Sequence, residues 1–149
     1  MNLMMFVLTL LSTPEGDWHI TKKLDRMEDR LTWTAYLKAD EGDGVIMVSC
    51  DGTNLEAYYL VPKATNEYRV RFGKDKPLKK EGEATVVHIP VGEGFTLKRM
   101  TALTIKNPRA FLKQAFAGKS HVIEVSGEQY YWANIRPKAL RALDGSCKL

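Results

Sequence analysis

Alternating apolar and polar positions recur along most of the chain. The clearest alternation is in residues 31–39 (LTWTAYLKA), and residues 18–24 (WHITKKL) and 67–72 (EYRVRF) show shorter versions of it. A period of two predicts half-buried β-strands. In residues 67–72 the same period leaves one solvent-exposed face, which carries Arg69 and Arg71.

Continuous apolar runs predict further strands. Residues 45–50 (VIMVSC) are apolar and rich in β-branched side chains, which is typical of a strand covered on both faces. Asp51-Gly52 favours a tight hairpin, because glycine tolerates positive φ, and residues 53–61 (TNLEAYYLV) are the expected partner strand. Residues 84–89 (ATVVHI) predict another strand.

Two segments in the middle of the chain have weaker patterns. Residues 73–83 (GKDKPLKKEGE) are polar and contain proline and glycine, so we expect a loop. Residues 97–105 (LKRMTALTI) fit a strand, although part of the segment also has helical spacing.

The stretch from Asn107 to Cys147 has the strongest local signals. Asn107 is a suitable N-cap and Pro108 suits the first helical position, so a helix should begin here and end at Gly118. Two strands should follow, residues 121–125 (HVIEV) and 130–135 (YYWANI), with Ser126-Gly127-Glu128 between them as a hairpin turn. A second short helix is expected from Pro137, with Leu140 and Leu143 facing the core.

These elements predict an α+β fold that is mostly antiparallel β, in a two-layer or sandwich-like arrangement, with two short helices in the C-terminal half. A parallel sheet would need regular strand-helix-strand alternation, and the sequence does not show it. We expect a single mostly-β domain over residues 17–149. Its 149 residues, 44% hydrophobic and 27% charged, fit one globular domain with one core.

Residues 1–16 form a separate apolar segment. The run from Leu3 to Leu11 is as long as the hydrophobic region of a secretory signal, but it is too short to cross a bilayer, which takes about 20 residues. No lysine or arginine precedes the run, and no A-x-A-like cleavage site follows it. The segment is therefore interpreted either as a signal-like segment or as a first β-strand, and no transmembrane segment is expected.

The charge pattern does not favour nucleic-acid binding. The net charge is +4, but basic and acidic residues are interspersed, whereas nucleic-acid binders usually carry a concentrated basic stripe. The densest basic run, residues 74–80, is interrupted by Asp75 and is interpreted as a solvated loop.

Catalytic motifs are not apparent in the sequence. His19, His88 and His121 are isolated in predicted strands, and none has a second histidine, cysteine or carboxylate at metal-ligand spacing. Residues 19–21 (HIT) match the H-x-T element of two-histidine phosphoesterases, but no second element accompanies it. We therefore expect no enzyme activity, no catalytic residue, no cofactor and no metal site.

Aromatic and arginine side chains give the best candidates for an interface. Tyrosine, tryptophan and arginine dominate interface hot spots, and the candidates here are Arg69, Arg71, Tyr131 and Arg136. The alternative for any single aromatic residue is an ordinary core position. Residues 130–132 (YYW) cannot all face the core, because adjacent strand residues point to opposite faces, so either Tyr131 or its two neighbours should be exposed.

Five features together resemble a known family: CDG followed by LEAYYL, then YRVRFGKDKP, NPRAFLKQAFAG, a strand pair, and a last helix ending at Cys147. They are similar to the type VI secretion-associated VasI (TagO) family of small exported bacterial proteins and its relatives in phages and prophages. The resemblance implies a periplasmic or envelope-associated accessory protein that binds another protein, and it carries over no catalytic residue. The alternative is a cytoplasmic, phage-type inhibitor or adaptor that contacts a protein or nucleic-acid complex. The oligomeric state is left open.

The two cysteines, Cys50 and Cys147, have two interpretations. They are either unpaired buried residues, as is usual in the cytosol, or a disulfide. The implied export favours the disulfide, and Cys147 follows a helix stop at Asp144-Gly145 that would fix its place. A bridge requires Cα atoms about 5.5 Å apart and no more than about 7 Å.

Overall fold

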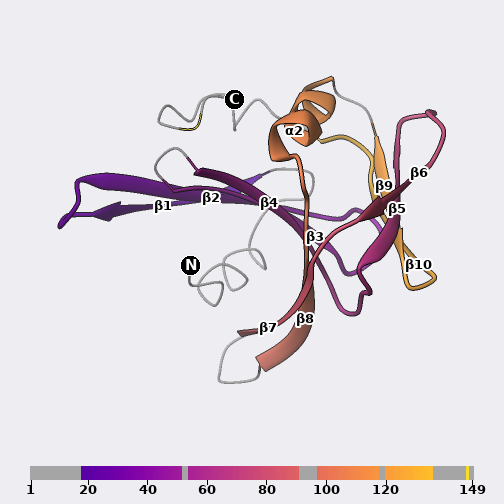
Figure 1. Ribbon diagram of the computed structural model, residues 1–149, viewed down its shortest axis with the longest axis horizontal. Helices are drawn as coiled ribbons and strands as arrows, with labels where there is room; N and C mark the ends of the chain where they lie inside the picture. The colour runs from indigo at the N-terminus through magenta and orange to yellow at the C-terminus, as the bar shows by residue number, and fades with distance from the viewer. Residues whose placement is uncertain (1–17, 52–53, 91–96, 118–119, 136–146, 148–149) are drawn as a thin grey trace.

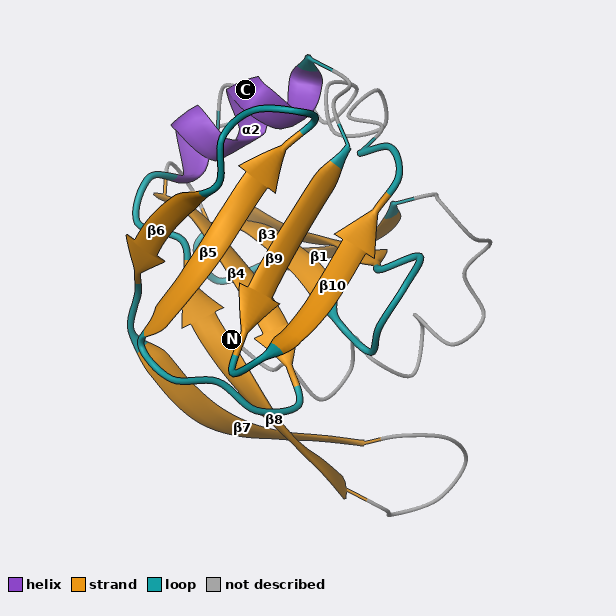
Figure 2. Ribbon diagram, turned by 90° about the vertical axis from the view of Figure 1, so that its right-hand side faces the viewer, coloured by secondary structure: helices purple, strands orange, loops and turns teal. Residues whose placement is uncertain are grey.

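A computed structural model of the chain describes residues 18–51, 54–90, 97–117, 120–135 and 147. Two antiparallel β-sheets face each other, and helix α2 (Pro108–Phe116) lies at one end of the space between them (Figures 1 and 2). The large sheet has the order β1 (His19–Asp25), β2 (Arg30–Lys38), β3 (Val45–Asp51), β4 (Asn54–Val61), β8 (Leu97–Thr104) and β7 (Ala84–Pro90). The small sheet has the order β10 (Glu128–Trp132), β9 (His121–Val125), β5 (Glu67–Phe72) and β6 (Leu78–Glu81).

The predicted mostly antiparallel, sandwich-like β protein is confirmed. One short helix is present in the described part of the chain, and it begins at Pro108 with Asn107 as its N-cap, as expected. The second helix predicted from Pro137, the apolar segment 1–16 and the helix stop at Gly118 lie outside the described residues. With nine residues, α2 is too short to cross a bilayer, and no other helix occurs in the described ranges.

The two faces of the large sheet are both buried near its centre. Trp33 and Ala35 belong to the core between the sheets, whereas Tyr36 packs with Met47 and Leu60 on the opposite face. The prediction that residues 45–50 are covered on both faces is therefore confirmed. The prediction that residues 31–39 are half-buried is wrong, because Tyr36 and Thr34 on the expected polar face are buried as well.

The structure decides the ambiguous middle segments. Residues 97–105 are mostly strand, since β8 pairs with both β4 and β7. The loop expected at residues 73–83 is wrong in part, because Leu78–Glu81 forms β6 and pairs antiparallel with β5. The strand was hidden because Lys80 occupies a position where the alternation calls for an apolar residue.

The chain leaves the small sheet at Gly82. A Cβ atom at this position would overlap the Thr104 carbonyl oxygen, so the close approach of the two backbones requires glycine. Directly afterwards, the Glu83 carbonyl accepts a hydrogen bond from the Thr104 amide at 3.0 Å, and β7 begins in the large sheet.

The β2–β3 loop fastens the opposite edge of the small sheet. The Asp40 amide donates to the Tyr131 carbonyl at 2.8 Å, and the Tyr131 amide donates to the Glu41 carbonyl at 3.0 Å. The Trp132 indole N–H also donates to the Leu37 carbonyl at 3.1 Å. These bonds occupy the backbone amide and carbonyl of Tyr131 at this edge and connect the two sheets.

The predicted β9–β10 hairpin is present, but its turn is shorter than expected, because Glu128 belongs to β10. Val125 pairs with Glu128, so the turn has two residues, and both have positive φ: 51° at Ser126 and 82° at Gly127. Two positive φ values match the strand twist of a tight hairpin, and glycine accepts one of them at no steric cost.

The structure contains the disulfide between Cys50 and Cys147. Cys50 lies on β3, both side chains are buried in the main core, and the Cα atoms are 6.0 Å apart. The bridge thus ties the end of the chain to the large sheet across a sequence separation of 97 residues.

We expect the disulfide to carry a large share of the stability. Closing a loop of 97 residues removes entropy from the unfolded chain, which the chain-entropy model puts at about 4 to 5 kcal/mol. Reducing the wild-type protein should lower the free energy of unfolding, measured by urea denaturation, by about 4 kcal/mol. The variant with Cys50→Ala and Cys147→Ala serves as control and should not respond to reductant. Equal stability of the oxidised and reduced wild type would contradict the expectation.

Candidate functional site

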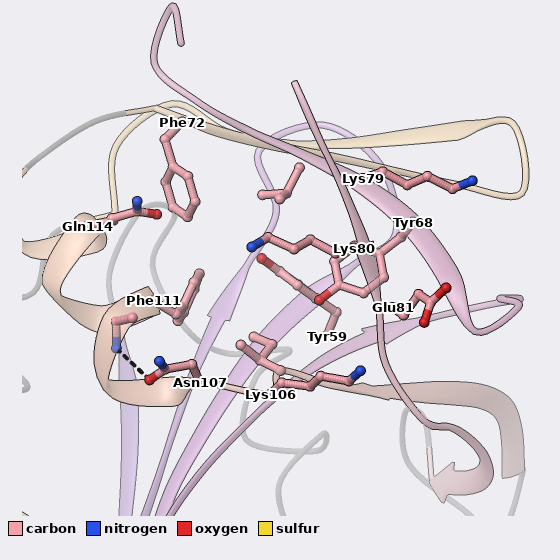
Figure 3. A pocket seen from close by; sticks show the side chains of 13 residues that line it. Tyr59, Tyr68, Phe72, Lys79, Lys80, Glu81, Lys106, Asn107, Phe111 and Gln114 are labelled. Atoms are coloured by element: carbon pink, nitrogen blue, oxygen red, sulfur yellow. Dashed lines mark hydrogen bonds between the residues drawn. The ribbon is translucent and has the colours of Figure 1, made fainter. Parts of the chain in front are cut away.

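A groove of about 400 Å³ lies between β6 and α2 (Figure 3). Its walls come from four parts of the chain: β4, the β5–β6 hairpin, the segment after β8, and α2. The lining side chains are Tyr59, Tyr68, Val70, Phe72, Lys79, Lys80, Glu81, Ile105, Lys106, Asn107, Ala110, Phe111 and Gln114.

Strand register places most of the lining residues of β5 and β6 on the inner face of the small sheet, and Lys79 and Glu81 on its outer face. Tyr68, Val70 and Phe72 alternate with exposed residues on β5, so all three point toward the large sheet. Tyr68 pairs with Lys80, and directly opposite residues of an antiparallel pair share a face. Lys80 therefore lies on the inner face, and Figure 3 shows its side chain reaching across the groove toward Phe72 and Phe111.

Helix α2 forms the opposite wall. The Asn107 side chain accepts a hydrogen bond from the Ala110 amide at 3.1 Å, which satisfies one of the free amides at the helix start. Phe111 is buried against Tyr59 and Phe72, with ring centroids 6.0 and 6.2 Å apart. The cap therefore fixes where the helix begins. Phe111 fixes how the helix packs against Tyr59 and Phe72, which form the aromatic floor of the groove.

The floor is built on a buried hydrogen bond between the sheets. The Tyr59 hydroxyl of β4 lies 2.6 Å from Nε2 of His121 on β9, and the two rings are stacked at 5.6 Å. Phe72 lies against the same imidazole at 4.5 Å. Nδ1 of His121 has no hydrogen-bond partner among the described residues.

Burial keeps this pair neutral. It lowers the pKa of His121 to about 3, and it raises the pKa of Tyr59 well above its usual range. Neither group would change charge near neutral pH, so the pair acts as a structural contact between the sheets.

The rim of the groove is positively charged. Three lysines and one glutamate line it, and Lys79 lies 3.8 Å from Glu67. Lys80 and Lys106 form no ion pair with a described residue. An aromatic floor with unpaired cations above it favours a ligand that is partly apolar and carries a negative charge.

The predicted interface residues lie on the other face of the same sheet. The pairings Arg69–Glu124, Arg71–Val122 and Val122–Tyr131 bring Arg69, Arg71 and Tyr131 together on its outer face. Tyr131 is half-buried, and its neighbours Tyr130 and Trp132 are buried, which resolves the alternative posed by the YYW run. Arg136 lies outside the described residues.

The two arginines on this outer face already have hydrogen-bond partners. The Arg69 guanidinium donates to Oε1 of Glu124 from Nε at 3.1 Å and from Nη2 at 2.9 Å. Hydrogen bonds from Gln129 and Arg69 lower the pKa of Glu124. Arg71 donates to the Asp75 carbonyl at 2.9 Å. The groove therefore has more unsatisfied binding capacity than the face that sequence reasoning selected.

Sequence reasoning missed the groove because its walls come from four separate segments. One local signal was available: PLKKE follows YRVRF after a short connection that contains glycine, which is compatible with a hairpin. Reading it that way would have placed a lysine on the inner face of an edge strand.

The described residues show no cluster of metal-binding side chains. His19, His88 and His121 lie on β1, β7 and β9. No group of three or more histidine, cysteine, aspartate or glutamate side chains within the described ranges could hold a metal ion.

Stability should depend on pH through His121. The pKa of His121 is 6.5, its ordinary value, in the unfolded chain, and it is about 3 in the folded protein. Between these two pH values only the unfolded state binds the proton. The contribution of neutral His121 to the free energy of unfolding is complete above pH 6.5. It falls by about 1.4 kcal/mol per pH unit as the pH decreases toward 3. Urea denaturation at pH 7 and at about pH 4.5 should show a loss of about 2 to 3 kcal/mol from this group.

A neutral replacement isolates the histidine. His121→Gln keeps a side chain that can bond to Tyr59 but does not titrate, so the variant should lose less stability than the wild type over the same pH range. His88→Gln, at an exposed position on β7, is the matched control and should behave as the wild type. An unchanged pH dependence in His121→Gln would contradict the assignment.

Comparison of the chain with protein-family models, curated proteins and solved structures finds no match. The function must therefore be argued from the groove and the strands around it.

Proposed function

We propose that this chain is a non-enzymatic binding protein that recognises a partner protein through the groove between β6 and α2. The observation that carries the proposal is the combination of an aromatic floor with unpaired lysines above it. The role is that of an accessory protein in an oxidising compartment, the periplasm or cell envelope.

The size and lining of the groove support recognition of a partner. Its volume of about 400 Å³ lies in the usual range for binding sites, about 300 to 1,000 Å³, and its lining is mainly aromatic and aliphatic. Tyrosine side chains contribute much of the energy of interfaces when they are packed around a pocket. Tyr68 and Phe111 line the groove here, and each keeps 6% of its surface exposed.

A protein partner fits better than a nucleic acid. Phosphate tracks need several cations in a row, because affinity grows with the number of phosphates neutralised. The groove has two lysines without ion pairs, and the guanidinium groups of Arg69 and Arg71 are engaged by Glu124 and Asp75. This arrangement suits one or two carboxylates.

The disulfide supports the proposed compartment. Disulfides persist in oxidising compartments such as the periplasm and are rare in the cytosol. The bridge between Cys50 and Cys147 agrees with the envelope role that the resemblance to the VasI (TagO) family implies.

Site-specific photo-crosslinking tests the proposed site. Leu78 on β6 is 48% exposed and directly precedes the lining residue Lys79, whereas Leu97 on β8 is 51% exposed and far along the chain from any lining residue of β6. A photoreactive amino acid at Leu78 should give a discrete cross-linked protein in cells that produce the chain, and the same group at Leu97 should not. Addition of Lys80→Glu should reduce the product at least about fivefold, because charge reversal repels an acidic partner. Equal products at both positions, or none at Leu78, would count against the proposal.

Thiol titration tests the compartment. Protein recovered from its native compartment with thiols blocked at lysis should show no free thiol before reduction and two after it, one each from Cys50 and Cys147. Two free thiols before reduction would place the working protein in a reducing compartment and favour the cytoplasmic adaptor.

A further inference from the structure

We propose that the partner binds as an added β-strand on the free edge of β6 and points an acidic side chain into the groove at Lys80. This inference rests on the proposed function, and it names the chemistry of the partner segment: an extended peptide in which acidic residues alternate with apolar ones.

The two edges of the small sheet differ. At β10 the β2–β3 loop already bonds to the backbone of Tyr131, whose amide and carbonyl are both engaged. At β6 no described strand or loop makes a backbone bond to the outer side of the strand. An edge strand with unpaired backbone groups is a template for another strand.

The backbone bonds at both ends of β5 show which groups of β6 are free. The Gly73 amide donates to Ser120, and because bonding alternates along an antiparallel pair, Arg71 and Arg69 also bond toward β9. Tyr68 and Val70 must then bond toward β6. The Gly82 amide donates to the Asn66 carbonyl at 2.9 Å, which fits the same alternation from the other end.

Lys79 and Glu81 therefore direct their backbone groups away from the sheet. Leu78 and Lys80 pair with Val70 and Tyr68 and use their N–H and C=O groups inside the sheet. The free edge offers the two amides and two carbonyls of Lys79 and Glu81 to an incoming strand. Neither residue has another backbone bond to a described residue.

The side chains of an added strand would alternate between the two faces of the sheet. Those on the inner face would lie over the groove, beside Lys80 and across from the helix wall. A carboxylate there reaches an ammonium group that has no ion pair among the described residues. Charge complementarity therefore selects acidic residues at the inward positions.

Lys80 also disfavours the addition of purely apolar strands. Natural edge strands avoid self-association by being short and by carrying inward-pointing charges, and β6 has four residues with Lys80 facing inward. A purely apolar strand would bury that ammonium group unpaired, whereas an acidic strand would neutralise it. The feature that protects the edge thus also sets its specificity.

A synthetic probe tests the inference on the oxidised full-length chain. The probe is a fluorescein-labelled eight-residue peptide of alternating valine and aspartate, and its counterpart has lysine in place of aspartate. Fluorescence anisotropy should show binding of the aspartate peptide, and binding at least about tenfold weaker for the lysine peptide. Lys80→Glu should weaken the aspartate peptide at least about tenfold. Lys113→Glu, on α2 but outside the groove lining, is the matched control and should change affinity by less than about threefold.

Backbone probes separate strand addition from simple charge attraction. Hydrogen exchange of the Lys79 and Glu81 amides should slow on peptide binding, while the already bonded Lys80 amide changes little. In two further peptides alternate amides are N-methylated: the valine amides in one peptide and the aspartate amides in the other. Strand addition predicts that only one of the two peptides loses affinity. Equal binding of both peptides, or unchanged exchange at Lys79 and Glu81, would overturn it.

The outcomes distinguish this inference from the proposed function. If photo-crosslinking at Leu78 gives a partner but the aspartate peptide does not bind, strand addition by an acidic segment is wrong and the groove remains a protein-binding site. If the crosslink is absent, the groove itself is not the binding site and both proposals fail.

Discussion

Tyr59 and His121 form a hydrogen bond in the middle of the layer between the two sheets, and the placement of the small sheet depends on it. Both side chains are buried, so a shift of β9 relative to β4 would leave two polar groups unpaired at about 1 to 3 kcal/mol each. Apolar contacts tolerate small displacements, but a buried hydrogen bond does not. Together with the bonds that hold β10, this bond fixes β9; β5 follows by its pairing with β9, and β6 by its pairing with β5.

Local chemistry made much of the fold predictable. The alternation in residues 67–72, the apolar run in residues 45–50, and the asparagine and proline at Asn107 and Pro108 each act within a few residues, and each gave the observed element. Ser126-Gly127 likewise gave the observed hairpin turn. The disulfide was expected from the resemblance together with a helix stop that lies outside the described residues. Spacing alone leaves two cysteines so far apart undecided.

What the sequence did not reveal depends on long-range packing. Tyr36 is on the polar side of its strand by pattern, yet Met47 and Leu60 from neighbouring strands bury it. By its sequence pattern Lys80 belongs to a charged loop, but the pairing with Tyr68 places it in an edge strand. Among the predicted interface residues, Arg69, Arg71 and Tyr131 do share one face, because alternation on paired strands is a local rule. The groove behind them required the tertiary structure.

The open edge and the groove have one topological cause. After β6 the chain turns at Gly82 into β7 of the large sheet, so no described strand follows β6 in the small sheet. It returns along β8 and enters α2 through residues 105–107, which form the far wall of the groove. The groove therefore results from the path of the backbone and not from a small side chain in the core. Larger core residues would strain the aromatic floor, and the outer edge of β6 would still have no backbone partner among the described residues. A segment that supplies backbone groups and a carboxylate together would satisfy both the edge and Lys80.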